Sequence, residues 1–188
     1  FPLILPPCGG KPKSPPREPS RAGSLSAGSS KPKIVSGTGD RMKKLLKIKR
    51  VRKNAALPTR GSAGAAGLDL YACLENPVSL EPGGLYRIPT GVAVALPDKN
   101  TVGLIFVRSG LGVRHGISLS NAVGVIDSDY RGELVVGLCN NGGNVYTLSP
   151  GERFAQLVVM PLLPVDLEET DDLGETERGT GGFGSTGK

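Results

Sequence analysis

The chain ends in a glycine-rich segment, residues 178–188, that carries side chains suited to an anionic, aromatic ligand. Five of its eleven residues are glycine, so a helix or strand there would cost much conformational entropy. A guanidinium and hydroxyls bind phosphate oxygens, and a phenyl ring stacks on a flat base; the segment supplies them as Arg178, Phe183, Ser185 and Thr186. The alternative is a frayed terminus. Phe183 disfavours that alternative, because the chain has only four phenylalanines.

Two internal segments also combine polar groups with glycine. Arg108-Ser109-Gly110 places a guanidinium and a hydroxyl at an expected helix start, where free backbone N–H groups bind anions. Alone, this tripeptide is a weak signal. The segment 124–133 holds four charged residues and Tyr130 in a turn between apolar runs. Its alternative reading is a hairpin whose Asp and Ser side chains cap their own turn.

Short β-rich runs separated by proline and glycine must position these groups. A single short helix is expected around residues 109–111, and nothing longer shows a helical period. From residue 42 the chain has the length of one domain, so the pattern predicts an all-β, jelly-roll-like sandwich or barrel over residues 42–177. The expected strands span residues 47–51, 68–73, 86–95, 101–107, 117–119, 133–140, 145–148 and 153–161.

The strands at residues 134–138 and 157–160 are apolar on both faces rather than alternating. Strands buried on both faces indicate that subunits pack against one another. A small sandwich has little interior room for a site, so binding sites are expected between subunits.

The first 41 residues differ from the rest in composition. They hold eight of the sixteen prolines, and their seven basic residues face only two acidic ones. Such a segment cannot bury enough apolar surface to order itself, which predicts a disordered arm. It has no dense basic cluster and no aromatic after Phe1, so nucleic-acid binding is not expected. Since the chain begins with Phe, this arm is read as a truncated leader, or as upstream in-frame sequence with the true start at Met42.

Membrane and metal-cage classes are disfavoured. No run approaches the roughly 18 apolar residues of a membrane span. The cysteines, Cys8, Cys73 and Cys139, are scattered, and the chain has a single histidine, His115, which is read as a structural group. This usage favours a reducing compartment and disfavours a zinc site, so a cytoplasmic protein is expected.

In their order along the chain, these segments closely resemble the five motifs of the trimeric deoxyuridine triphosphate nucleotidohydrolases, the dUTPases. The resemblance covers residues 44–188, and one departure is Val107, where the family often has proline. The matching segments are Ala66 to Tyr71, Arg108 to Leu111, Gly124 to Glu133, Gly151 to Gln156 and Arg178 to Gly187.

The resemblance implies hydrolysis of dUTP between the α and β phosphates, with Mg²⁺ bound by the triphosphate. Asp127 matches the general base that activates the attacking water, a task suited to a carboxylate within about 3 Å of that water. Asp69 matches a residue that supports the metal through its water shell, since Mg²⁺ keeps most of its waters. The products would be dUMP and pyrophosphate.

The same resemblance implies the substrate contacts. Phosphate would be held by Arg108, Ser109, Gly110 and Gln156, and the γ-phosphate by Arg178, Ser185 and Thr186 of the tail. Uracil would stack on Phe183 and be read by Asn121, while Tyr130 would leave no space for a ribose 2′-hydroxyl. Val125 and Gly184 complete the predicted substrate-binding set.

Assembly and alternatives follow from the resemblance as well. A homotrimer is expected whose sites each draw motifs from different subunits, with residues 178–188 as a mobile lid. A dCTP deaminase on the same fold is a second hypothesis, but it would lack the turn from Asp127 to Tyr130. A non-catalytic relative is the third, and it would be expected to have lost Asp127, Arg108 or Phe183. None of these is lost.

Overall fold

A computed structural model describes residues 44–182 of the chain. Residues 1–43 and 183–188 lie outside this range. The predictions for the arm at residues 1–41 and for Phe183, Gly184, Ser185 and Thr186 therefore remain predictions. The described residues belong to one compact unit by their contacts, and this unit holds the sheets.

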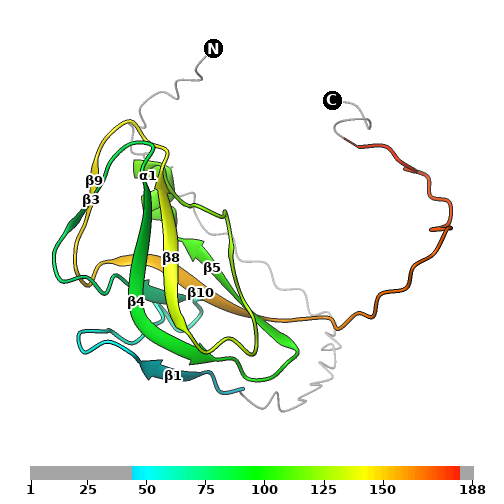
Figure 1. The fold of residues 1–188 in the computed structure, drawn as a ribbon, viewed down its shortest axis with the longest axis horizontal. Coiled ribbons are helices and arrows are strands. Elements are labelled where there is room, and N and C mark those ends of the chain that lie inside the picture. Colours follow the sequence, from blue (N-terminus) through cyan, green and yellow to red (C-terminus); the bar gives the residue numbers. More distant parts are fainter. Residues whose placement is uncertain (1–43, 183–188) are drawn as a thin grey trace, which may run out of the picture. The chain divides into compact units, whose positions relative to one another are not determined.

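Among the described residues, two four-stranded antiparallel sheets and a two-stranded antiparallel sheet build the domain (Figure 1). The first sheet has the order β1-β4-β8-β6, the second β2-β10-β5-β7, and β3 pairs with β9. One helix, α1 (Ser109–His115), follows β5 directly. The strands are β1 (Lys47–Arg50), β2 (Leu68–Tyr71), β3 (Val78–Leu80), β4 (Leu85–Ala95), β5 (Thr101–Val107), β6 (Ile117–Leu119), β7 (Gly124–Ile126), β8 (Glu133–Asn140), β9 (Tyr146–Leu148) and β10 (Arg153–Pro161).

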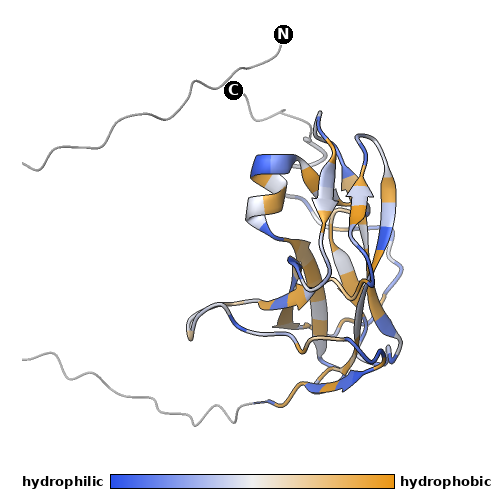
Figure 2. Ribbon diagram, turned by 90° about the vertical axis from the view of Figure 1, so that its left-hand side faces the viewer, coloured by the Kyte–Doolittle hydropathy of each residue, from blue (hydrophilic) through white to orange (hydrophobic). Residues whose placement is uncertain are grey.

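A single apolar core fills the space between the sheets. On β8, Leu134, Val136 and Leu138 point inward and are buried, as an alternating strand requires. From the other sheet, Phe154 and Leu157 of β10 are fully buried against them. Figure 2 shows the apolar residues recurring along the strands in orange. The all-β prediction is confirmed.

The two-sided apolar strands do not bury both faces within one chain. Val135 of β8 is 39% exposed and Met160 of β10 is 45% exposed. The expectation that neighbouring subunits cover the outer faces of these strands therefore remains a prediction. The outward apolar residues are left uncovered among the described residues.

A bulge interrupts the pairing of β4 with β8. Pro89 lies opposite Val135, but Ala93 lies opposite Glu133, so β4 carries extra residues at this point. Gly91 stands in the bulge with a φ of +72°, a region that glycine adopts without steric cost. A Cβ there would lie 2.5 Å from the Cβ of Ala55 and 2.7 Å from the Sγ of Cys73, so only glycine fits.

Most predicted strands are found at or within two residues of the predicted bounds, and three differences stand out. The segment expected to be only a turn contains β7, and β3 was not expected. The helix extends to His115, where Gly116 in a left-handed conformation ends it with its N–H bonded to the Gly112 carbonyl at 3.1 Å.

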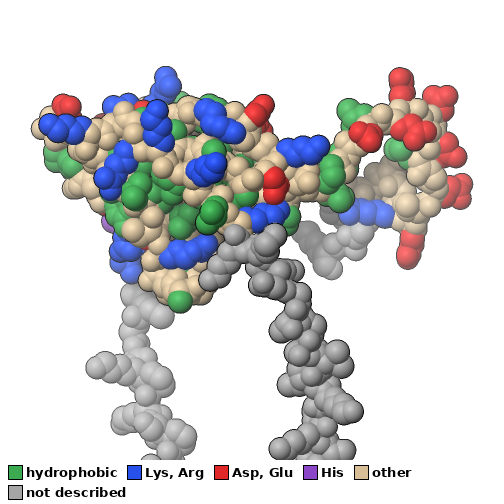
Figure 3. All heavy atoms as spheres, turned by 90° about the horizontal axis from the view of Figure 1, so that it is seen from below, with side chains coloured by type: hydrophobic (Ala, Val, Ile, Leu, Met, Phe, Trp, Pro, Cys, Tyr) green, Lys and Arg blue, Asp and Glu red, His purple; other side chains and the backbone are tan. Residues whose placement is uncertain are grey.

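After β10 the chain continues through residues 162–182 without helix or strand. Residues 164–177 include seven acidic and no basic residues, and these acidic side chains gather at one end of the view in Figure 3. Residues 42–163 carry fourteen basic and eight acidic residues. The two parts of the unit are therefore opposite in net charge. In the described range, no helix has the length and apolar character needed to span a membrane.

Candidate functional site

The turn from β5 into α1 exposes backbone and side-chain donors together. Arg108 precedes the helix in an extended conformation, and its own N–H is used on the Phe154 carbonyl at 3.1 Å. The next N–H groups that bond within the helix belong to Leu111 and Gly112, which both donate to the Arg108 carbonyl. The N–H groups of Ser109 and Gly110 therefore remain available at an exposed turn. A Cβ added at Gly110 would meet no atom within 4 Å, so packing does not require this glycine.

Asp69 holds two arginines beside this turn. Its Oδ1 lies 3.2 Å from Nε of Arg108, and its Oδ2 accepts a hydrogen bond from Nη1 of Arg153 at 3.1 Å. Asp69 is buried on β2, whereas both arginines are partly exposed. A buried carboxylate between two guanidiniums fixes both side chains, and Nη1 of Arg108 also donates to the Arg153 carbonyl at 3.5 Å. The arrangement is a preorganised cationic surface.

Gln156 adds an amide to the same surface. It lies on β10 directly opposite Asp69 of β2, so the register of the two strands brings the motifs together. Gly67 makes room for it, because a Cβ on Gly67 would lie 2.8 Å from Oε1 of Gln156. A cavity of about 510 Å³, called here the Asp69 cavity, is lined by Gly61, Ala65, Ala66, Gly67, Asp69, Arg108, Ser109, Gln156 and Val158.

A second cavity adjoins the first across Arg108 and Ser109. This cavity, of about 480 Å³, is lined also by Arg114, His115, Tyr146, Glu152 and Arg153. The His115 ring packs on the Tyr146 ring with centroids 4.6 Å apart, which supports the structural reading of this histidine. Tyr146 bonds in turn to the Glu152 carboxylate. Burial, and then the hydrogen bond to Glu152, raise the pKa of Tyr146 to about 12.

Asp127, Val125 and Tyr130 line a separate cavity. This cavity, called here the Asp127 cavity, has a volume of about 280 Å³ and is completed by Arg87, Ile126, Glu133, Leu134 and Val135. Asp127 follows β7 and is exposed, and its carboxylate accepts no hydrogen bond from residues 44–182. An exposed carboxylate without a partner is available to a ligand or water.

The turn that carries Asp127 is held by its own neighbours. The Tyr130 N–H donates to the Asp127 carbonyl at 3.2 Å, and the Tyr130 hydroxyl donates to the Glu133 carbonyl at 3.0 Å. Arg131 donates from Nη1 to the carbonyls of Ser128 and Tyr130, each at 2.8 Å. The turn is thus ordered before any ligand binds.

The structure does not bring Asp127 next to Arg108. On the paired strands β5 and β7, Ile126 lies opposite Gly103, five residues before Arg108. At roughly 3.3 Å per residue, this separation is on the order of 16 Å. The donors suited to phosphate, at Arg108 and the turn that follows it, and the predicted base Asp127 therefore lie in two separate places on one chain.

Neither Asn121 nor Arg178 is among the residues that line these three cavities. Asn121 is exposed in the turn before β7, and Ala122 beside it has a φ of 61°, which is uncommon for a residue with a Cβ. The Val123 N–H donates to the Asn121 carbonyl at 2.6 Å, which closes this turn tightly. Arg178 donates from Nε to the Gly181 carbonyl at 2.8 Å within the C-terminal segment.

A metal cage is not part of the described site. Residues 44–182 contain no group of three or more His, Cys, Asp or Glu side chains placed to hold a metal ion. Asp69 still has carboxylate lone pairs beyond those used by the arginines, and these accept hydrogen bonds from metal-bound water. The donor set fits a magnesium ion carried by a ligand's phosphates.

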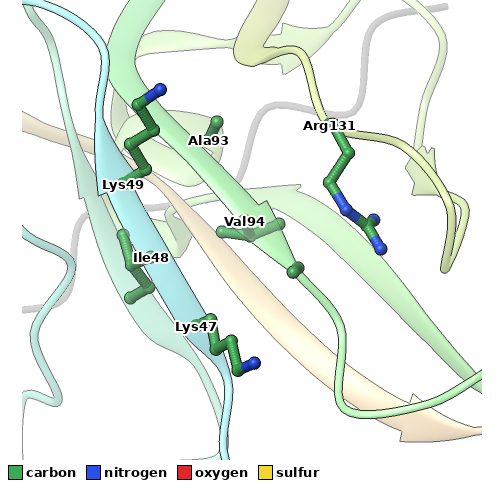
Figure 4. A pocket seen from close by; sticks show the side chains of 7 residues that line it. Lys47, Ile48, Lys49, Ala93, Val94 and Arg131 are labelled. Carbon is green, nitrogen blue, oxygen red and sulfur yellow. The ribbon is translucent and has the colours of Figure 1, made fainter.

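Another cavity, of about 330 Å³, contains none of the predicted site residues. It lies between β1 and the end of β4, with Arg131 on its far side (Figure 4). Its lining is Lys47, Ile48, Lys49, Ala93, Val94, Ala95 and Arg131.

Sequence reasoning missed Arg153 and Glu133. Arg153 lies within a recognised motif, but its partner is 84 positions away, so its role depends on the β2–β10 register. Glu133 ends the charged turn, and its bidentate partner Arg52 is 81 positions away. The charges of Asp69 and Arg52 were visible in the sequence, but their pairing with Arg153 and Glu133 was not.

Comparisons with known proteins agree with this geometry. The dUTPase family model matches residues 53–187. The deoxyuridine 5'-triphosphate nucleotidohydrolase of Burkholderia multivorans is 50% identical over 147 residues, which are 78% of this chain and 99% of that protein. The enzyme of the same name from Ralstonia pickettii is 49% identical with the same coverage.

Solved structures give the same result. The dUTPase of Staphylococcus bacteriophage 80alpha, solved with dUPNHPP, matches with a TM-score of 0.70 and 30% identity over 78% of this chain and all of that chain. The dUTPase of phage phi11 of S. aureus, described with a structural Mg(II) ion, matches with a TM-score of 0.61 and 26% identity over 69% of this chain and 98% of that chain. With a family model matching most of its length and relatives near half identity, the chain belongs to the dUTPase family of nucleotide-hydrolysing enzymes.

Proposed function

We propose that this chain hydrolyses dUTP to dUMP and pyrophosphate, with water activated by Asp127 attacking the α-phosphorus. The observation that carries the proposal is the pair of guanidiniums fixed by Asp69 beside the exposed Ser109–Gly110 turn. Such a surface suits a triphosphate, and the named activity of relatives at about half identity supports dUTP as the substrate. The reaction would keep uracil out of DNA and supply dUMP for thymidylate synthesis.

Phosphate binding is assigned to the Asp69 cavity. Arg108 and the Ser109 hydroxyl donate to phosphate oxygens, and the amide of Gln156 donates from the opposite strand. The bare Gly110 backbone lets a phosphate approach the free N–H groups closely. These donors are in place before binding, which is the condition for stabilising charge that develops on the leaving pyrophosphate.

Magnesium is the proposed cofactor. A bound triphosphate would hold the ion, and Asp69 would accept hydrogen bonds from its water shell. When bound, the ion neutralises phosphate charge and orients the leaving group. A structural Mg(II) ion is described for the phage phi11 dUTPase, which supports the metal for the family.

Base and sugar recognition is assigned to the turn that carries Asp127 and to the C-terminal lid. The Tyr130 ring, fixed through its hydroxyl, excludes a ribose 2′-hydroxyl by volume. Uracil is contacted by Asn121, from the tight turn before β7, and by Val125 of β7. Within the lid at residues 178–188, Phe183 stacks on the base, while Arg178, Gly184, Ser185 and Thr186 close over the phosphates.

A homotrimer with shared sites is the proposed assembly, in which the domain at residues 42–177 supplies the subunit body. Its support is the separation of about 16 Å between the Arg108 and Asp127 regions along one chain, too long for both to act on one α-phosphate. The outward apolar Val135, which lines the Asp127 cavity, offers a surface for a neighbouring subunit. The scattered cysteines agree with a cytoplasmic enzyme.

A substrate panel tests the activity. Purified chain is incubated with Mg²⁺ and dUTP, dTTP, UTP or dCTP, and pyrophosphate and ammonia are both measured. Pyrophosphate release from dUTP alone is expected. Ammonia release from dCTP would instead identify the deaminase, a reading that the Asp127-to-Tyr130 turn disfavours, and no turnover of any nucleotide would identify a non-catalytic relative.

Mixing inactive variants tests the shared site. Asp127→Asn chains and Arg108→Ala chains are each expected to be inactive alone. After unfolding and refolding together, activity should return, because some sites receive an intact Asp127 from one chain and an intact Arg108 from another. A mixture that stays inactive although mixed assemblies form would overturn the shared site.

A further inference from the structure

The Glu133 carboxylate is held by three hydrogen bonds although it lies outside every predicted substrate contact. Arg52 donates bidentately, from Nε to Oε1 at 2.7 Å and from Nη2 to Oε2 at 2.9 Å. The backbone N–H of Gly91 donates to the same Oε1 at 2.8 Å. Paired arginine–carboxylate contacts of this kind fix direction as well as distance. Arg52 and Gly91 therefore hold Glu133 in one orientation.

Glu133 is the first residue of β8 and directly follows the turn that carries Asp127. Its backbone carbonyl accepts the hydrogen bond from the Tyr130 hydroxyl, so the same residue that is held by Arg52 holds the Tyr130 ring. Glu133 is also one of the residues that line the Asp127 cavity. A shift of Glu133 would thus move the ring and the turn together.

The Gly91 donor is fixed by the fold. Gly91 lies in the β4 bulge opposite the start of β8, with a left-handed φ and no room for a Cβ. Its carbonyl accepts the N–H of Val51, which immediately precedes Arg52. One backbone position therefore ties the segment after β1 to the first residue of β8. The bulge is a rigid frame on which Glu133 is held.

We propose that Arg52 and Glu133 are positioning residues for catalysis, which set the place of Asp127 and Tyr130 by fixing the end of their turn. The inference rests on the proposed function, because it concerns the geometry of that reaction. The competing reading is that the ion pair only stabilises the fold. The two readings differ in whether turnover and sugar selection change in a chain that remains folded.

Three variants separate the contribution of the charge from that of the bidentate hydrogen-bond geometry. Glu133→Gln keeps an oxygen for the Gly91 N–H and removes the charge that pairs with Arg52. Arg52→Gln removes the guanidinium, whose side chain is 48% exposed, so folding should tolerate the change. Arg52→Lys keeps the positive charge but loses the bidentate geometry, and it should recover part of the activity that Arg52→Gln loses.

The matched control is the ion pair between Lys44 and Asp98, which has the same 2.7 Å contact but lies away from both cavities. Lys44→Gln breaks that pair without touching the turn. It is expected to keep the parent values of kcat, KM and the dUTP-to-UTP preference.

The measurements are kcat and KM for dUTP, the ratio of kcat/KM for dUTP to that for UTP, the thermal midpoint, and hydrogen exchange of peptides over residues 127–132. For Glu133→Gln and Arg52→Gln we expect a loss in kcat on the order of tenfold to a hundredfold, since misplacement by about 1 Å costs that much. KM should change less, the dUTP-to-UTP preference should fall, and exchange in the turn should rise.

Folded variants with parent kcat, parent preference and parent exchange in the turn would overturn the proposal. A variant with a lowered thermal midpoint, but with the parent kcat at temperatures below that midpoint, would also overturn the proposal. The ion pair would then have a purely stabilising role. If the parent chain does not hydrolyse dUTP, the proposed function fails. The exchange measurement then still decides whether Arg52 and Glu133 hold the turn, so the two failures are distinguishable. Should Glu133→Gln not fold, the exposed Arg52 variants give the result.

Discussion

Two glycines beside the phosphate-type donors have opposite structural duties. Gly67 is required by packing, because a Cβ there would lie 2.8 Å from the Gln156 amide oxygen. Gly110 is not, because the space around its missing Cβ is empty over 4 Å. A glycine in a helix costs backbone entropy, and where the space beside it is open no neighbouring atom requires the missing side chain. Its value is the access that it gives a ligand to the backbone.

Gly110→Ala should therefore separate stability from activity. Alanine in the first turn of α1 is expected to raise stability by about 0.5–1 kcal/mol, as for other glycines replaced in helices. The methyl group meets the phosphate chain, so kcat/KM for dUTP should fall. Thermal unfolding and steady-state kinetics on the same sample measure both. A variant with lowered stability and parent kcat/KM would contradict this assignment of Gly110.

Asp127→Asn should keep nucleotide binding and lose turnover. An amide cannot take the proton from water, and loss of a general base costs about 10²- to 10⁴-fold in rate. Calorimetric binding of a non-hydrolysable imido analogue of dUTP, together with kcat, gives both quantities. Asp129→Asn is the matched control, since Asp129 is an exposed carboxylate two residues further along the same turn. Parent turnover by the Asp127 variant would show that the base is assigned wrongly.

Residue types in the motifs could be read from the sequence, whereas their partners could not. The types of Arg108, Ser109 and Asp127 state their chemistry directly. The clamp of Arg153 on Asp69 exists only because β10 pairs with β2 in one register, and a slip of one residue would turn Arg153 to the other face. Long-range side-chain pairing thus requires the fold.

At the scale of elements, the turn residues Pro and Gly predicted the bounds of the strands better than the periodicity of the strands themselves did. The bounds of β5, β8 and β10 match those expected because Pro and Gly residues flank their apolar runs. The missed strands β3 and β7 have only three residues each, too few to show a period. Most of the α1 sequence has weak helix propensity, with glycine at Gly110 and Gly112, so its full length follows from packing of Leu111 rather than from propensity.

The β9–β10 connection gives the domain a pH dependence at the alkaline end. Tyr146 of β9 bonds to Glu152, and its pKa is raised to about 12 from an ordinary value of 10.0. The folded chain therefore favours the neutral phenol. Below the ordinary pKa this contribution to stability is fully present, and above it the unfolded chain ionises first. The free energy of unfolding should fall as pH rises from about 10 towards about 12.

Tyr146→Phe tests this dependence. The variant lacks the ionising group, so its free energy of unfolding should decline less steeply over the same alkaline range. Denaturant unfolding monitored by circular dichroism at several pH values gives the slopes. If the free energy of unfolding falls with pH equally steeply in parent and variant, the loss of stability at alkaline pH comes from groups other than Tyr146.

The whole unit is divided by charge. Residues 42–163 carry an excess of six basic groups, and residues 164–177 carry seven acidic and no basic groups. Opposite charges on a body and on an extended segment favour contact between them, and salt weakens that contact. This charge division favours contact of the acidic segment with a basic subunit body, and the segment leads directly into the proposed lid at residues 178–188.

Truncation after Glu177 should leave a folded assembly with little activity. The sheets and the acidic segment remain, so circular dichroism, thermal midpoint and mass in solution should match those of the parent. Loss of the lid donors is expected to lower kcat/KM on the order of 100-fold or more. The same truncation with parent activity would remove the lid from the reaction.

The register of β5 and β7 also determines how altered chains lower the activity of assemblies that they form with parent chains. In the proposed assembly each chain lends its Arg108 region to one reaction centre and its Asp127 region to another. A chain with one altered region inactivates a single reaction centre, but a chain in which both regions are altered inactivates two centres. Doubly altered chains mixed into a parent population therefore interfere beyond their own number, and the inhibition curve counts how many centres each chain serves.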